Sequence, residues 1–279
     1  MDWTEEIYQA RIENQETRSR HAAGSPSPVE IGAYLAACDG LPADGVALVL
    51  GMTPELRNMA LRRFESVVSL DASETAIQLY SDWLPEDLRS RERVIRGNWA
   101  DVAGLPVGKV HAILGDGIVG NLAGVSEAIR LFEILRLMLL PGGRCVMRNV
   151  FVPADLDLGR FGFARLLEEF RRGLLDEAEF GFCSRMLGFH QDAYHPDVEI
   201  LDNRSVYQRI DGLCETGVLN EREASAIARY RFMGRNFFPS ETTWIRILKD
   251  AGFGMPVTHP AERRLWSSFY QVQSFGPLT

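Results

Sequence analysis

The sequence lacks most of the patterns that would assign a protein to a class at once. No apolar run reaches the roughly 18 residues of a membrane-spanning helix, and the first residues do not resemble a signal peptide. The histidines form no HExxH motif, and the four cysteines, Cys38, Cys145, Cys183 and Cys214, show no CxxC spacing. Lysines and arginines form no dense cluster, and the net charge is −8. We therefore expect a cytoplasmic protein with reduced thiols and no metal, which binds neither nucleic acid nor membrane.

A strand, turn, helix and strand pattern near residue 50 is the most informative feature that the chain does have. The apolar run 46–50 ends at Gly51, a helical pattern follows from Pro54, and a second apolar run stops at Asp71. The acid follows the glycine by about 20 residues, the spacing at which a carboxylate on a second strand reaches a ribose over the first turn. This pattern predicts a cofactor that contains adenosine.

The residues of this first turn indicate which adenosine cofactor it is. A dinucleotide fingerprint, GxGxxG, needs a second glycine where this chain has Thr53. Glu55 stands where a phosphate would bind, and a carboxylate there repels a pyrophosphate but tolerates a cation. The turn therefore favours S-adenosylmethionine (SAM) over NAD. The alternative interpretation is that Glu55 only matches the dipole of the helix that starts here.

The alternation of strands and helices defines the expected core. Expected strands are 46–50, 66–70, 93–96, 110–114 and 144–150, and the helices between them are 54–64, 73–81 and 125–139. Strands separated by helices indicate an α/β fold with a doubly wound, mostly parallel sheet, which binds ligands at the carboxyl ends of its strands. Helical patterns also cover 1–23 and 29–38, so 1–44 is an N-terminal helical segment.

The pattern changes after Val150. Residues 151–238 show helical stretches at 160–175, 204–216 and 221–234, and no convincing strand. Asn220 with Glu223 is a plausible cap for the last of these. A helix from Ser240 and a final strand or hairpin at 265–275 then resume the earlier pattern. We expect one α/β domain over 1–279, with 151–238 inserted as a helical cap that selects the substrate.

Polar residues and glycines follow three further strand ends: Asp71-Ala72, Asn98-Trp99 and Asp116-Gly117. In a doubly wound sheet these ends converge on one crevice. A carboxylate at Asp71 can accept both ribose hydroxyls, and the Asn98 amide can read the adenine edge. Trp99 or Ala72 would pack against the adenine face, and Asp116 lies where the amino group or sulfonium of SAM would be.

With these strand ends, the chain resembles class I SAM-dependent methyltransferases over residues 45–150 and, more weakly, 240–275. The resemblance is carried by segments 48–55, 70–73, 97–99, 114–117 and 140–143. It implies a fold that ends in an antiparallel hairpin and the following cofactor contacts: Gly51, Met52, Thr53 and Glu55 at the methionine moiety, Asp71 at the ribose, Ala72, Asn98 and Trp99 at the adenine, and Asp116 and Gly117 at the amine. The chain departs from the family pattern in two places. Val49 replaces the acidic residue that usually stands two positions before the glycine, and the segment 51–55 replaces the usual glycine-rich turn.

The residues that would act on an acceptor give weaker signals. His190, Tyr194 and His195 are candidates for a catalytic base, or else surface and capping residues. Tyr230, Arg231, Arg235 and Asn236 are candidates for recognising an anionic acceptor, or else the solvated face of a helix. In relatives the N-terminal helix closes over the site, and here this would bring Tyr8 and Arg18 to the substrate.

Three functions remain open at this stage. The first is a methyltransferase that moves the SAM methyl group in line to a small-molecule acceptor, with a homodimer left open. The second is an enzyme that uses SAM without donating its methyl, by intramolecular cyclisation or elimination, or one that binds NAD instead. The third is a methyltransferase-like fold kept as a non-catalytic interaction module, an idea to which the altered first turn lends some support.

Overall fold

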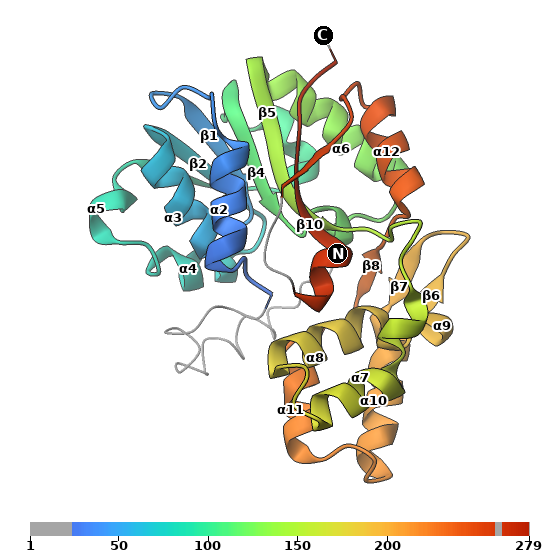
Figure 1. Ribbon diagram of the computed structural model, residues 1–279. Coiled ribbons are helices and arrows are strands. Elements are labelled where there is room, and N and C mark those ends of the chain that lie inside the picture. Colours follow the sequence, from blue (N-terminus) through green and yellow to red (C-terminus); the bar gives the residue numbers. More distant parts are fainter. Residues whose placement is uncertain (1–23, 260–263, 279) are drawn as a thin grey trace.

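A seven-stranded sheet forms the centre of the molecule, as a computed structural model of residues 24–259 and 264–278 shows (Figure 1). The strand order is β3-β2-β1-β4-β5-β10-β9. Its strands are β1 Val46–Leu50, β2 Ser66–Asp71, β3 Glu92–Arg96, β4 Val110–Asp116, β5 Leu139–Val150, β9 Val257–His259 and β10 Tyr270–Phe275. The first five pair in parallel, and β10 runs antiparallel between β5 and β9. The expected doubly wound, mostly parallel sheet with a final antiparallel hairpin is confirmed.

Helices cover both faces of this sheet (Figure 1). They are α2 Pro28–Ala37, α3 Pro54–Arg63, α4 Glu74–Ser81, α5 Glu86–Arg89, α6 Val125–Met138 and α12 Glu241–Asp250, with short 3-10 turns η2 Trp99–Gly104 and η3 Val119–Asn121. On one face Phe132 of α6 meets Trp244 of α12 edge to face, with ring centroids 5.3 Å apart. On the other face, Tyr34 of α2 and Leu56 of α3 belong to a second core. Burial of both faces explains why the strands are nearly continuous apolar runs.

Residues 151–238 form a separate body, which we call the helical lobe. Figure 1 shows it below the sheet, at the end where β5 leaves. Its elements are η4 Leu158–Phe161, α7 Phe163–Arg171, α8 Glu177–Cys183, η5 Ser184–Gly188, α9 His190–Ala193, β6 Tyr194–His195, β7 Ile200–Asp202, α10 Asn203–Glu215, α11 Glu221–Ala228 and β8 Arg235–Phe237. The four-residue turn η6 Leu265–Ser268 lies outside the lobe but packs beside α8. Unlike the other short turns, η5 is π-helical.

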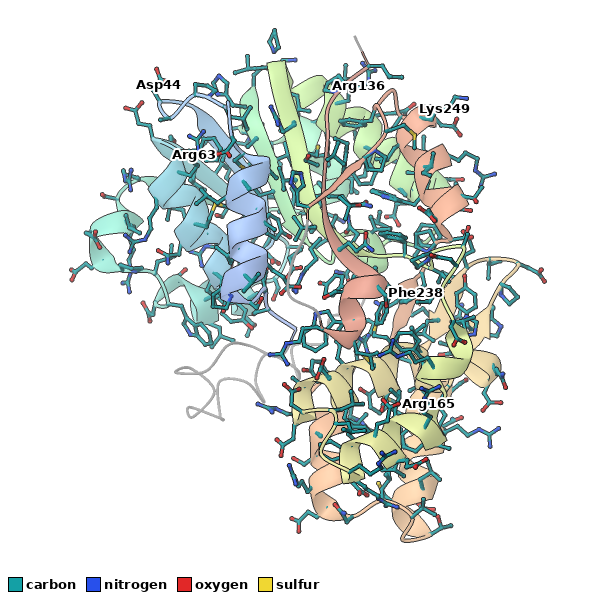
Figure 2. The ribbon with its side chains drawn as sticks, in the orientation of Figure 1. Asp44, Arg63, Arg136, Arg165, Phe238 and Lys249 are labelled. Atoms are coloured by element: carbon teal, nitrogen blue, oxygen red, sulfur yellow. The ribbon has the colours of Figure 1, made fainter. Side chains whose placement is uncertain are left out.

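The chain enters and leaves the lobe through two adjacent segments. The Val152 N–H donates to the Pro239 carbonyl at 2.8 Å, and the Glu241 N–H donates to the Val152 carbonyl at 2.9 Å. Phe238, labelled in Figure 2, lies between the sheet and the lobe and packs against Phe269 at the start of β10. The paired connections and this shared aromatic core fix the lobe against the sheet.

Two sequence expectations for the lobe are wrong. It contains a small antiparallel sheet, β6-β7-β8, which was missed because strands of two or three residues are too short to show alternation. The helix expected over 221–234 ends at Ala228. Its predicted cap is confirmed, because Asn220 and Glu223 form a capping box. Beyond Ala228 the chain forms a turn at 229–230 and then an irregular segment in which Phe232 is buried.

Two further features of the sheet were not predicted from the sequence. The 141–143 segment lies within the long strand β5, beside a register shift in its pairing with β4. Glu92 of β3 is almost fully buried against Arg57. The four cysteines are free thiols, as expected, and burial raises the pKa of Cys38 to about 11.

Arg57 ties α3 to the edge of the sheet through a buried ion pair. Its Nε and Nη2 each lie 2.6 Å from a Glu92 carboxylate oxygen, and Nη1 donates to the Tyr80 carbonyl at 2.8 Å. The Ser69 hydroxyl donates to the same carboxylate at 2.6 Å. The hydrogen bonds to the pair offset the free-energy cost of removing its two charges from water. Removing one member would leave the other charge uncompensated.

We predict that Arg57→Met lowers the free energy of unfolding by about 3–5 kcal/mol, because Glu92 is left as a lone buried charge. Urea denaturation followed by circular dichroism measures this loss. Adding Glu92→Leu to the variant should recover part of it. Arg165→Met, which breaks an exposed pair with Glu169, serves as the control and should cost less than about 1 kcal/mol. A loss at Arg57 no larger than that of the control would contradict the buried pair.

Candidate functional site

A cavity of about 760 Å³ opens at the carboxyl ends of the central strands. Its sheet side consists of the turns after β1, β2, β3 and β4, and its other side consists of residues from η5, the 230–236 segment and Phe182 of α8. This volume falls within the range of about 300–1,000 Å³ that is typical of small-molecule sites. The sheet and the helical lobe therefore share one cavity.

The turn after β1 brings backbone close to the carboxylate of Asp71. Gly51 has φ +92°, a conformation that L side chains rarely adopt, and its N–H donates to the Leu70 carbonyl at 2.8 Å. A Cβ placed on Gly51 would lie 3.9 Å from Asp71 Oδ2 and 3.8 Å from the Trp99 ring. Met52 and Thr53 continue the cavity wall. These contacts bring the predicted residues of the first three strand ends together.

The Asp71 carboxylate is held in place by backbone groups and not by a cation. Its Oδ1 accepts from the Ser73 N–H at 2.8 Å. Burial raises the pKa of Asp71, although the N–H groups of Ser73, Ala72 and Met52 oppose the shift. No ion pair joins Asp71 to the residues that the structure describes, so this acid faces the cavity without a protein counter-charge.

The end of β3 fixes the indole ring of Trp99. Its Nε1 donates to the Leu70 carbonyl at 3.0 Å, and the Gly97 N–H donates to the Asp71 carbonyl at 2.9 Å. Asn98 also lines the cavity, but its Oδ1 accepts from the Ala100 N–H at 3.0 Å and caps η2. The oxygen that would accept from the adenine amino group is thus already engaged in a cap.

Asp116, at the end of β4, belongs to a buried charge cluster that the sequence analysis missed. Its carboxylate accepts from Arg148 Nε at 2.8 Å and Nη2 at 3.0 Å, and from the Tyr270 hydroxyl at 2.8 Å. Arg148 Nη1 lies 2.8 Å from Glu30 of α2, and only 1% of the Arg148 side chain is exposed. Burial opposes the charge of Arg148, but Asp116 and Glu30 outweigh it and raise the Arg148 pKa. Asp116 therefore reaches the cavity as a compensated carboxylate.

Tyr34 completes this cluster from α2. Its hydroxyl donates to the Gly115 carbonyl at 2.7 Å and accepts from the Arg148 N–H at 2.8 Å. The Tyr270 ring lies against the guanidinium, 4.1 Å from centroid to Cζ, and burial raises the pKa of its hydroxyl well above the usual value. The sequence signal that could have revealed this cluster is the charged residue Arg148 within the expected strand 144–150.

We predict that Arg148→Met lowers the free energy of unfolding by about 3–5 kcal/mol, because two buried carboxylates lose their counter-charge. Urea denaturation followed by circular dichroism measures this loss.

Arg172→Met is the control for this measurement, since its exposed pair with Glu168 should contribute at most about 1 kcal/mol. A loss for Arg148→Met that is no larger than that of the control would show that the two carboxylates do not depend on this arginine.

The lobe contributes an aromatic wall to the cavity. Phe182 stacks on Tyr270 and meets Tyr230 edge to face, each with centroids 5.5 Å apart, so it joins the lobe to β10. Tyr230 lines the cavity as predicted, and burial raises its pKa to about 12. Arg235 also lines it, as an exposed residue of β8 and not on the helix face considered as its alternative.

Arg185 is a cavity residue that the sequence analysis did not select, and it contacts Asn236, which also lines the cavity. Arg185 lies on the π-helical turn η5, and its Nη2 donates to Asn236 Oδ1 at 2.5 Å. Asn236 in turn donates to the Gly120 carbonyl at 2.9 Å and accepts from Asn203 at 2.9 Å. No local pattern marks a π-helical turn in a sequence, which is why Arg185 was passed over.

Several predicted residues are not brought to the cavity. His190 stacks on Tyr194, with ring centroids 4.5 Å apart, and the Tyr194 hydroxyl donates to the Phe238 carbonyl at 3.0 Å. Neither of them, nor His195, lines the cavity, so the structure gives these base candidates no access to a ligand there. Glu55 occupies the first turn of α3 but is also absent from the cavity wall. Tyr8 and Arg18 lie outside the described residues.

The described part of the chain contains no group of three or more His, Cys, Asp or Glu side chains that could hold a metal ion. Within residues 24–259 and 264–278, no helix is both long and apolar enough to cross a membrane.

Solved structures share this fold at low sequence identity. A protein named as a putative Zn-dependent alcohol dehydrogenase from Rhodobacter sphaeroides is 13% identical and matches over 99% of both chains, with a TM-score of 0.58. The CcbJ methyltransferase from Streptomyces caelestis is 15% identical over 95% of this chain and 96% of its own, with a TM-score of 0.58. CalO1, a methyltransferase in calicheamicin biosynthesis, is 15% identical over 98% of this chain and 58% of its own, with a TM-score of 0.51.

The sequence matches no protein-family model and no curated protein. The strand order and these structural similarities establish that the chain has the fold of class I SAM-dependent methyltransferases.

Proposed function

We propose that this protein is a SAM-dependent methyltransferase that transfers a methyl group in line to a small-molecule acceptor. The proposal rests on one observation: the strand ends of a methyltransferase fold and an aromatic wall of the lobe face each other across the same cavity. The first side suits an adenosyl cofactor, and the second suits an organic acceptor. CalO1, which shares the fold, was solved with S-adenosylhomocysteine (SAH), the demethylated cofactor, and this supports the choice of cofactor.

The residues present fit an adenosyl ligand that carries no phosphate. The Gly51 turn leaves its backbone open beside Asp71, whose carboxylate has no cation as partner among the described residues and can accept from ribose hydroxyls. Trp99 is fixed by its own hydrogen bond and offers a ring for adenine to pack against. A second glycine for a pyrophosphate is absent from the turn, where Thr53 stands.

Bound SAM would supply a methyl group made reactive by the neighbouring positive sulfur. The task of the chain is then to align the acceptor and to exclude water. Asp71 would hold the ribose, and Asn98 and Ala72 would flank the adenine. Asp116 with Gly117 would lie at the amino-acid end of the cofactor, where Arg148 already balances the Asp116 charge.

Residues 151–238 would act as the cap, with Phe182 and Tyr230 against the acceptor. The described residues that line the cavity include no histidine, so we assign no base.

We predict that the protein binds SAH with micromolar-range affinity and does not bind NAD, as isothermal titration calorimetry can measure. The physical reason is an open ribose acceptor at Asp71 without a glycine-rich phosphate turn. Analysis of the small product then separates the two SAM-using alternatives. A methylated acceptor indicates transfer, whereas methylthioadenosine alone indicates intramolecular displacement. Tight binding of NAD without any response to SAH would refute the proposal.

We predict that Asp71→Ala weakens SAH binding by about tenfold or more, because each charge-assisted hydrogen bond contributes about 1.5–3 kcal/mol. Calorimetry on a variant with unchanged thermal melting measures the effect. Asp82→Ala, at an exposed acid beyond α4, is the matched control and should bind SAH normally. Unchanged SAH affinity in folded Asp71→Ala would instead make Asp71 a structural residue of the β2 turn.

A further inference from the structure

Arg185 stands apart from the other cations of the cavity wall because it is partly buried and also lacks an acidic partner among the described residues. Three arginines of the described chain line the cavity. Arg231 is paired with Asp211 at 3.0 Å, and Arg235 is exposed to solvent. Arg185 is partly buried, and no carboxylate within residues 24–259 and 264–278 lies within ion-pair distance of it. Burial lowers the pKa of Arg185, yet an arginine stays protonated in a protein.

The hydrogen bonds of Arg185 leave some N–H groups of its guanidinium without a partner among the described residues. Nη2 donates to Asn236, and Nη1 contacts only the Met186 sulfur, at 3.1 Å. Nε is buried and has no hydrogen-bond partner. A buried N–H without a partner is rare in native proteins and calls for a bound water, ion or ligand group. Nη2 carries a second N–H, so one donor remains there beside Nε.

Other arginines of this protein show what normally occupies that position. Arg57, Arg148 and Arg171 each hold a carboxylate across Nε and Nη2, at distances of 2.6 to 3.0 Å. In Arg185, Nε and Nη2 donate to no carboxylate of the described residues. The side chain is nevertheless fixed, because Asn236 is itself tied to Gly120 and to Asn203.

The surroundings of Arg185 define the rest of the ligand. The guanidinium lies over the Phe232 ring, 5.7 Å from its centroid, and the neighbouring cavity wall is made by Met186, Phe182 and Tyr230. These groups belong to the lobe, whereas the residues expected to hold the cofactor belong to the sheet. A ligand with a flat apolar skeleton and one carboxylate would match this site, because its skeleton can pack on the aromatic wall while its carboxylate pairs with the guanidinium.

We propose that Arg185 is the specificity residue of the acceptor site and selects an aromatic or similarly apolar acceptor that bears a carboxylate. This inference rests on the proposed function and adds to it the chemical class of the acceptor. The carboxylate would accept from Nε and Nη2, and Asn236 would be the positioning residue that holds the guanidinium. The cofactor also carries a carboxylate, so the test has to separate the two sources.

The experiment uses calorimetry with three acids, benzoate, naphthoate and indoleacetate, each compared with its neutral amide, in the presence and absence of SAH. At least one acid should bind the unmodified protein about tenfold or more tightly than its amide. Arg185→Met should abolish this preference. Arg185→Lys should keep only part of it, because a lysine ammonium cannot donate two parallel hydrogen bonds to one carboxylate. Arg209→Met removes an exposed charge of α10 outside the cavity and should change nothing.

Three results would overturn the inference. They are equal binding of acids and amides in all three pairs, a preference that survives Arg185→Met, and a loss of SAH affinity in Arg185→Met without any acid preference. The last would assign the guanidinium to the cofactor carboxylate. Thermal melting checks folding, and Arg185→Lys provides a second variant should Arg185→Met not fold. If the unmodified protein fails to bind SAH, the proposed function fails, while the acid preference measured without SAH still tests Arg185.

Discussion

The buried guanidinium of Arg148 is the interaction on which the rest of the site depends. It compensates Glu30 of α2 and Asp116 of β4, and it lies against the ring of Tyr270 of β10. One side chain of β5 therefore joins three elements that are distant in the sequence. Such a cluster is stable only while every member is present, since a single deletion leaves an uncompensated charge away from water. The end of β4, and with it one wall of the cavity, is held in position by this constraint.

The helical lobe is attached to that frame through aromatic packing and through the ion pairs of Arg264 with Asp176 and Glu179. Phe182 stacks on Tyr270, whose hydroxyl donates to Asp116, so the lobe contacts the same residue that completes the Arg148 cluster. The paired backbone segments around Val152 and Pro239 hold the two connections together. This arrangement lets the lobe vary its inner wall, where Arg185 and Tyr230 lie, while the sheet keeps the strand ends in place. A division of this kind suits a fold that combines a common cofactor with different acceptors.

Much of the sheet could be predicted from the sequence because its signals are local. Four of the expected strands are runs of four or five residues closed by glycine or aspartate, and they coincide with β1 to β4, at whose ends Asp71, Trp99 and Asp116 lie. The caps at Asn220 and Ser240 follow from residue type and spacing.

What escaped prediction depends on long-range contacts. The partners of Arg148 lie 118, 32 and 122 residues away at Glu30, Asp116 and Tyr270, so no local pattern joins them. The sequence also favoured His190 and His195 as bases because histidine titrates near neutrality, but only the fold decides which titratable groups reach a cavity. Arg185 was hidden in the same way by a π-helical turn.

The central claim is that one cavity holds the cofactor on the strand ends and the acceptor against the lobe. A crystal structure of the protein with SAH tests it most directly. The claim predicts ribose hydroxyls on the Asp71 carboxylate, adenine beside Trp99, and the SAH sulfur facing the part of the cavity lined by Phe182 and Tyr230. SAH bound outside this cavity, or bound in it with the sulfur turned away from the lobe, would contradict the claim.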